Sequence, residues 1–293
     1  MELKYTIKES DLYKTVKEVL KCEFKISDRL LLKLKRTSKI FLNGNQTYPY
    51  ILINVGDTIS ILIDNDEENS NIVPTKMDLD IIYEDNCFLV INKPAGISTH
   101  PSILHYTDSL SNGVRYYFDS IGLHKKIRPI NRLDKNTSGL ILFAKNEYIQ
   151  NNFAQQMQSG DFVKEYLTIV NGILEKKSGT INMPISRKEN SIIERIVSSS
   201  GETAITEYKV QEEKNNMSLI LCRLKTGRTH QIRVHMKAIG HPVVGDFLYG
   251  SESPLIDRQA LHSYHIKAIH PVTKQTLEYF CSLPDDMENL LNK

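Results

Sequence analysis

The sequence predicts an α+β fold. A mixed, largely antiparallel β-sheet forms its core, helices flank the sheet, and a small amino-terminal module precedes it. The 293 residues are enough for one large domain with a sizeable core and one small one. Most apolar segments are short and follow one another through polar turns, which is typical of hairpins between neighbouring strands. Few segments have helical periodicity, so the strands do not alternate with helices as they do in a parallel sheet.

Composition indicates an ordinary globular protein. Hydrophobic residues make up 40% and charged residues 25% of the chain, and the net charge is +2. No apolar run approaches the length that spans a bilayer, and residues 1–4 lack the hydrophobic start of a secretory signal. The cysteines are far apart, which predicts free or buried thiols rather than disulfides or a zinc site. They are Cys22, Cys87, Cys222 and Cys281. We therefore expect a cytoplasmic protein.

Charge divides the chain into two regions. Residues 21–40 carry seven Lys or Arg against two acidic residues, a balance of +5, whereas residues 64–85 carry eight acidic residues against one lysine, a balance of −7. The polar start of the acidic stretch is typical of an exposed linker, and the basic stretch is where phosphates would bind. We therefore expect an amino-terminal module over residues 1–63, an acidic linker over 64–78 and a large domain over 79–293.

The amino-terminal module should contain a basic helix and short strands. Ser27 or Asp28 can cap a helix that runs to Lys35. Strands are expected at residues 40–42, 51–53 and 58–61. This pattern resembles the RNA-binding module first known from a small-subunit ribosomal protein, the S-four module. That resemblance would bring four basic side chains against phosphates: Lys33, Lys35, Arg36 and Lys39. A small domain with a solvated charged helix explains the pattern equally well.

The first half of the large domain should form a hairpin, a core strand and a helix. Two apolar runs, at residues 81–85 and 88–92, are strands joined by a tight polar turn, and a loop follows over residues 93–101. Five consecutive apolar residues, 140–144, are typical of a strand buried on both faces. A helix over about residues 146–159 follows, and Gly160 suits its end.

The second half should form three strands and one helix. Residues 164–170 alternate as a strand does, and strands near residues 203–210 and 217–224 are joined through the polar residues 212–216. A loop ending at Gly227 or Thr229 should lead into a helix that stops at Gly240. Its inward face should be Ile232, Met236 and Ile239, and its other face the basic group His230, Arg233 and Lys237. Free backbone amides at this helix start favour anions, although a solvated polar face is the alternative.

Residues 131–145 combine a candidate reactive group with a rigid strand. In an extended backbone Arg132 and Asp134 lie on one side and Leu133 on the other. A turn-forming run follows, in which Gly139 can adopt backbone angles closed to other residues. The carboxylate is thus beside a guanidinium at the mouth of a core strand, where a reactive group keeps its position. The simpler explanation is that Asp134 caps the turn and pairs with Arg132.

Three ordered motifs resemble the RluA family of RNA pseudouridine synthases. Residues 131–139 resemble the signature His-Arg-Leu-Asp, two variable residues and Thr-Ser-Gly, with Asn131 where the family most often has His. Asn-Lys-Pro-x-Gly at residues 92–96, followed by His-Pro, precedes it at about the family's interval. Residues 225–235 and 240–250 resemble the late motif. The resemblance implies a pseudouridine-synthase fold with an active cleft across the sheet.

The resemblance also assigns roles to individual residues. Asp134 matches the catalytic nucleophile or base, and Arg233 matches the basic residue that pairs with it. Tyr166 matches the tyrosine that packs on the target base, and Arg132 an arginine that helps bind RNA with the base extruded. A nearby cation favours the ionised carboxylate, and an aromatic ring suits stacking on a flipped nucleotide. The late motif adds three expected RNA contacts: Arg228, Thr229 and His230.

The implied reaction is the isomerisation of specific uridines in structured RNA to pseudouridine. Ribosomal large-subunit RNA is the first expected substrate and tRNA the second. Nothing is transferred between molecules, so we expect no cofactor and no metal, and the two nearby histidines, His230 and His235, are spaced wrongly for a shared helical face. We expect a monomer that binds RNA and no membrane. The alternatives are a non-catalytic RNA-binding or ribosome-assembly protein, and a small-molecule hydrolase using Asp134 with His230.

Overall fold

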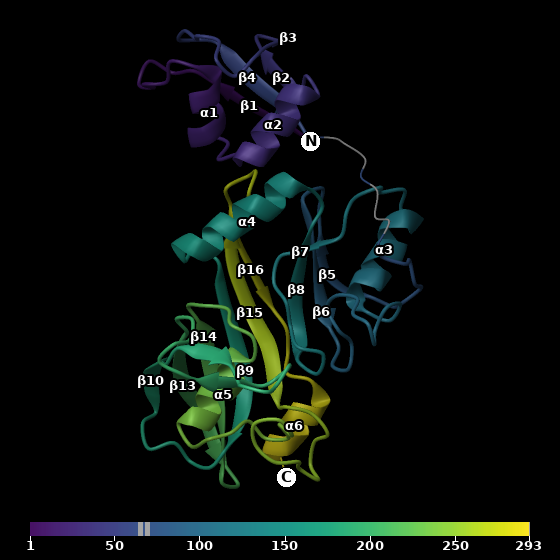
Figure 1. Cartoon of the computed structure of the whole chain (residues 1–293), viewed down its shortest axis with the longest axis vertical. Coiled ribbons are helices and arrows are strands. Elements are labelled where there is room, and N and C mark those ends of the chain that lie inside the picture. The colour runs from purple at the N-terminus through teal and green to yellow at the C-terminus, as the bar shows by residue number, and fades with distance from the viewer. Residues whose placement is uncertain (64–66, 68–70, 293) are drawn as a thin grey trace.

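The computed structural model describes residues 1–63, 67 and 71–292. A small antiparallel sheet with two helices lies at one end of the molecule, and a ten-stranded mixed sheet with its helices fills the rest (Figure 1). The described helices are α1 (Val16–Cys22), α2 (Asp28–Arg36), α3 (Leu110–Ser120), α4 (Glu147–Ser159), α5 (Gln231–Ala238) and α6 (Asp285–Asn292). No helix in these ranges is long and apolar enough to cross a membrane. The predicted linker lies partly outside the described residues, and the division of the chain into domains stays a prediction.

The amino-terminal sheet has the strand order β1-β4-β2-β3. Its strands are β1 (Glu2–Thr6), β2 (Ile40–Leu42), β3 (Asn45–Gln46) and β4 (Thr58–Leu62). The basic helix is confirmed as α2, because Ser27 accepts a hydrogen bond from the backbone N–H of Leu30, as an N-cap does. Buried side chains of this helix, such as Leu30 and Leu34, pack toward the sheet while its charged residues lie outside.

The strand predicted at residues 51–53 is wrong. Asn43 and Gly44 both have positive φ (51° and 81°) and form a two-residue turn that pairs β2 with β3 instead. Of the predicted strand, Leu52 makes only an isolated bridge, with Thr15, and its side chain is 73% exposed. The apolar triplet looks like a strand in sequence because exposed apolar residues carry the same pattern as buried ones.

The large sheet has the order β10-β13-β14-β9-β15-β8-β6-β5, with β16 beside β15 and β7 beside β8. All its described pairings are antiparallel except β15 with β8, so the α+β, largely antiparallel prediction is confirmed. Its strands are β5 (Asp80–Glu84), β6 (Phe88–Lys93), β7 (Arg128–Pro129), β8 (Ser138–Ala144), β9 (Val163–Asn171), β10 (Ser178–Asn182), β13 (Ile205–Lys214), β14 (Met217–Leu224), β15 (Leu261–Ile269) and β16 (Thr276–Phe280). A separate hairpin is formed by β11 (Ile185–Arg187) and β12 (Arg195–Val197).

The central strand β8 is buried along its whole length, as predicted from its apolar run. The β13–β14 hairpin is longer than predicted, because β13 continues to Lys214 and the turn is reduced to Asn215 and Asn216. Both asparagines have positive φ, 52° and 56°, which a tight two-residue hairpin turn requires and which Asn tolerates better than most residues. The polar residues 212–214 are therefore exposed strand rather than loop.

The amino-terminal module packs on α4 of the large domain. One continuous apolar cluster includes Phe24 and Leu30 of the module and Ile149 and Phe153 of α4. At its edge Lys33 Nζ lies 2.6 Å from a carboxylate oxygen of Glu147 in α4. Its ammonium also lies 3.6 Å from a carboxylate oxygen of Glu67, so it pairs with two acidic side chains of the protein, and a contact of Lys33 with phosphates stays a prediction.

Candidate active site

The loop that carries Asp134 joins β7 to β8 and is fixed to β8 by Asn131. The buried Asn131 side chain donates to the backbone oxygen of Leu140 (3.0 Å) and accepts from the backbone N–H of Leu142 (2.9 Å). An amide can make this pair of bonds because it carries a donor and an acceptor side by side. The residue that departs from the RluA signature therefore has a structural role at the start of the loop.

Two buried cations bind the backbone just after Asp134. Lys93 is fully buried, and its ammonium donates to the backbone oxygens of Pro94, Ile97 and Lys135 at 2.8, 2.8 and 3.0 Å. Burial is the main reason that the pKa of Lys93 falls to about 7. Arg258 donates from Nη1 to the backbone oxygen of Asn136 (3.2 Å). These contacts fix the main chain that positions the Asp134 carboxylate.

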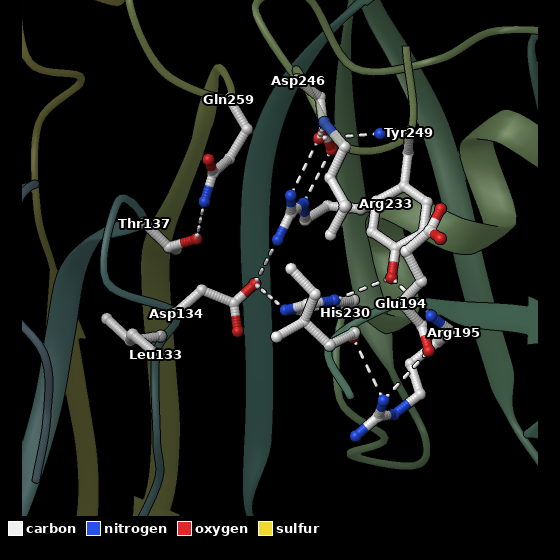
Figure 2. Close-up of polar contacts among 12 residues, drawn as sticks. Leu133, Asp134, Thr137, Glu194, Arg195, His230, Arg233, Asp246, Tyr249 and Gln259 are labelled. Carbon is white, nitrogen blue, oxygen red and sulfur yellow. Dashed lines mark hydrogen bonds and ion pairs between the residues drawn. The ribbon is translucent and has the colours of Figure 1, made fainter. Parts of the chain in front are cut away.

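The two oxygens of Asp134 have different surroundings. Oδ2 accepts a hydrogen bond from Nη1 of Arg233 (3.1 Å) and lies 3.7 Å from Nε2 of His230. Figure 2 shows both contacts on this oxygen, while the other oxygen, Oδ1, points away from them. The carboxylate is thus oriented through Oδ2, while Oδ1 is turned away from Arg233 and His230.

The guanidinium beside Asp134 belongs to Arg233 in α5 and not to Arg132, so the simpler explanation that pairs Asp134 with Arg132 is wrong. The alternative of a solvated polar face does not hold for Arg233, since only 4% of this residue is exposed. Burial acts to lower the pKa of Arg233, but Asp246 and Asp134 more than offset this effect and raise it. Arg233 is therefore a fixed cation between two carboxylates, and Asp246 was not predicted from the sequence.

His230 is oriented by Tyr249. The tyrosine hydroxyl oxygen accepts from the backbone N–H of Arg195 (2.8 Å) and lies 2.7 Å from Nδ1 of His230. The hydroxyl proton is then free to be donated to Nδ1, so a neutral ring carries its own proton on Nε2, toward Asp134. Burial lowers the pKa of His230, against the opposing charge of Asp134, so that the ring is neutral at pH 7.

Asp134 lies in a cleft of about 740 Å³ that crosses the sheet. Six residues predicted as catalytic or RNA-binding share its lining: Arg132, Asp134, Tyr166, Arg228, Thr229 and His230. The cleft is large enough for a nucleotide, and its size fits the range of ligand sites in proteins. Arg233 lies behind this lining, next to Asp134.

Individual residues of the cleft differ in their exposure. Arg132 and Thr229 are exposed, whereas Tyr166 in β9 is 6% exposed and its pKa is raised by burial, so its phenol keeps its proton. Arg228 contacts the carboxylate of Glu202 and donates from Nε to the backbone oxygen of Thr203 (3.1 Å). The other three predicted RNA-binding residues lie on α2 in the amino-terminal module and do not line the cleft: Lys33, Lys35 and Arg36.

One group of described residues has the composition of a metal site: Asp85, Cys87 and His270. Both ring nitrogens of His270 are already hydrogen bonded. Its Nδ1 lies 3.0 Å from the backbone N–H groups of Val272 and Thr273 and accepts from them, so Nε2 carries the proton and donates to Asp85 at 2.9 Å. This arrangement is that of a turn stabilised by hydrogen bonds, at the end of β6 remote from Asp134.

Comparisons with known proteins agree with the geometry of the cleft. A family model described as RNA pseudouridylate synthase matches residues 87–238. The RNA pseudouridine synthase YhcT of Bacillus subtilis, whose name marks it as uncharacterized, is 39% identical over 274 residues, 93% of this chain and 90% of that protein. Ribosomal large subunit pseudouridine synthase D of Neisseria meningitidis is 36% identical over 277 residues, 90% of this chain and 74% of that protein.

Two solved structures are also similar to this chain. Human RNA pseudouridylate synthase domain containing 1 superposes with a TM-score of 0.58 at 27% identity, over 70% of this chain and 83% of that one. Human RNA pseudouridylate synthase domain containing 4, at 20% identity and a TM-score of 0.59 over 72% and 91% of the two chains, shares the fold. Since the family model matches more than half of the chain and a relative matches nearly all of it, the chain belongs to the RluA family of RNA pseudouridine synthases, which are isomerases.

Proposed function

We propose that this enzyme isomerises specific uridines in structured RNA with Asp134 as its catalytic carboxylate, and that ribosomal large-subunit RNA is its substrate. The observation that carries the proposal is the orientation of Asp134. The guanidinium of Arg233 binds one oxygen, and the other oxygen is left for the nucleotide in the cleft. A uridine must leave its base stack to reach this carboxylate.

The reaction rearranges one nucleotide. The bond from uracil N1 to ribose C1′ breaks, a bond from uracil C5 to C1′ forms, C5 loses its proton and N1 gains one. Asp134 can attack the sugar, attack the base or remove a sugar proton, and each route needs an ionised carboxylate beside the flipped nucleotide. Tyr166, buried and protonated in the cleft wall, is suited to packing on the uracil, and the exposed Arg132 to binding the RNA backbone.

The proposed substrate rests on the relatives of this chain. One relative of this chain is named for the ribosomal large subunit, and it matches 90% of this chain. Transfer RNA is the second candidate. The experiment that separates them is pseudouridine mapping across all RNAs of a strain lacking the gene, with the wild-type protein or Asp134→Ala restored to it.

We expect sites in large-subunit ribosomal RNA to be lost on deletion and to return with the wild type but not with Asp134→Ala. Loss confined to tRNA would overturn the substrate assignment and leave the chemistry intact. Full restoration by Asp134→Ala would instead support the non-catalytic alternative for this chain.

We further propose that the amino-terminal module binds RNA through Lys35, Arg36 and an exposed tyrosine. Tyr50 is 69% exposed, and its ring has two ammonium groups near its centroid, Lys17 at 5.7 Å and Lys35 at 6.0 Å. Lysines attract phosphates, and an open aromatic ring stacks on bases without sequence preference. This arrangement favours an RNA-binding surface over a merely solvated helix.

Replacing Lys35 and Arg36 together with Gln should weaken binding of full-length RNA and reduce the slope of log Kd against log salt by about two, because each phosphate contact contributes about one. Binding titrations at several salt concentrations measure the slope. Lys176→Gln, an exposed lysine in the loop after β9, is the control and should leave the slope unchanged. A double variant with the wild-type slope would exclude phosphate contacts by this face of α2.

A further inference from the structure

Asp246 is a buried carboxylate that does not line the cleft but is bonded to the cation beside Asp134. It is fully buried, in the segment between α5 and β15. Its two oxygens accept hydrogen bonds from Nε and Nη2 of Arg233, at 2.7 and 2.8 Å. Oδ1 also accepts from the backbone N–H groups of Leu248 and Tyr249, at 3.1 and 3.2 Å. The carboxylate is thus fixed to the main chain and binds one whole edge of the guanidinium.

The ring of Tyr249 packs against one face of the same guanidinium. The central carbon of the Arg233 guanidinium lies 4.9 Å from the Tyr249 ring centroid, a distance suited to a cation–π contact. The ring is 4% exposed, and its hydroxyl is bonded to the backbone of Arg195 and to His230. Asp246 binds one edge of the guanidinium and Tyr249 packs on one face, so the two residues together hold the group in one orientation (Figure 2).

This restraint decides how Arg233 meets Asp134. An unrestrained Arg tends to pair with a carboxylate through two parallel N–H···O bonds, which would engage both oxygens of Asp134. Asp246 already occupies the edge formed by Nε and Nη2, and Nη1 reaches only Oδ2 of Asp134. The position of Asp246 therefore explains why the second oxygen of Asp134 stays open.

We propose that Asp246 is a positioning residue that keeps Arg233 from pairing with both oxygens of Asp134, so that Oδ1 remains available to the uridine. This inference rests on the proposed catalytic role of Asp134. Asp246 also offsets part of the charge of Arg233. Without it, the full positive charge of Arg233 would act on Asp134.

The test is Asp246→Asn in steady-state and single-turnover assays on a uridine-containing stem-loop, with pH varied. We expect kcat to fall about 100-fold, as misorientation of a reacting group does, with KM little changed. We also expect the acid limb of the pH–rate profile to move to lower pH. A merely structural role would not move this limb. A crystal structure of the variant should show Arg233 in contact with both oxygens of Asp134.

Asp85→Asn is the matched control. Like Asp246, Asp85 accepts from the backbone N–H groups two and three residues later and from a buried side chain, here His270, but it lies at the far end of β6 from the cleft. Both variants should lose thermal stability, and only Asp246→Asn should change the acid limb. If Asp246→Asn does not fold, Asp246→Ser keeps an oxygen acceptor for the two backbone amides and is expected to give the same kinetic result.

A double-mutant cycle with Arg233→Lys tests whether Asp246 acts through Arg233. In the Arg233→Lys enzyme, Asp246→Asn should change kcat by no more than about two-fold. An equal loss in both backgrounds, or a wild-type acid limb in Asp246→Asn, would overturn the inference. An active Asp134→Asn variant would refute the proposed function. An inactive Asp134→Asn together with an Asp246→Asn of wild-type activity would refute only the positioning role of Asp246.

Discussion

Asp134→Asn is expected to lower the single-turnover rate of isomerisation by roughly 10⁴-fold, the upper range for loss of a group that acts as acid or base. Asn has the same shape and can still accept a hydrogen bond from Nη1 of Arg233, so the loop keeps its conformation. It cannot be ionised, and all three routes open to the carboxylate need the charge. The rate and not the fold should therefore change.

The rate can be measured with RNA labelled with tritium on uracil C5, because formation of the new carbon–carbon bond releases that hydrogen to water. Asp257→Asn, which removes an exposed carboxylate, should release label at the wild-type rate. Anisotropy titrations should show that Asp134→Asn still binds the RNA. Label release by Asp134→Asn within 100-fold of the wild type would remove this carboxylate from the chemistry.

Gly139→Ala should cost about 4 kcal/mol of unfolding free energy, at the top of the range for single substitutions. Gly139 has φ of +107°, and a Cβ there would lie 2.3 Å from the backbone oxygen and 2.7 Å from the backbone nitrogen of Ser263. This is the point where β8 pairs with β15, five residues after Asp134, so the two strands would have to separate. Backbone atoms cannot move aside as the end of a flexible side chain can.

Urea unfolding of Gly139→Ala and of Gly160→Ala separates the cost of steric overlap with Ser263 from the cost of backbone strain. Gly160 also has positive φ, +86°, but nothing lies within 4 Å of a Cβ added to it. Its substitution should cost about 1 kcal/mol from backbone strain alone. Equal losses for the two variants would show that the close approach of β8 and β15 has no cost of its own.

The sequence predicted the parts of the site that are local in the chain. Arg132 and Asp134 belong to one short motif and His230 and Arg233 to another, so their order could be compared with a family, and the cleft or its wall contains them all. The buried strand β8 was predicted because five consecutive apolar residues, 140–144, leave little choice of environment.

The rest depends on contacts between distant segments. Lys93 donates to the backbone of Lys135, 42 residues away, and a lysine in sequence is expected to be exposed. Asp246 lay inside a recognised motif, but its importance comes from meeting Arg233 in the folded chain. The pairing of Lys33 with Glu147 could not be predicted for the same reason, because Glu147 is 114 residues away in the chain.

The single apolar cluster shared by the module and α4 has a practical consequence. Removing residues 1–63 would expose Ile149 and Phe153 to water and leave Glu147 without its lysine. A shortened enzyme would therefore be prone to self-association, and its loss of RNA affinity would say nothing about which surface the nucleic acid touches. The amino-terminal module is not a detachable accessory, and its contribution has to be tested one side chain at a time.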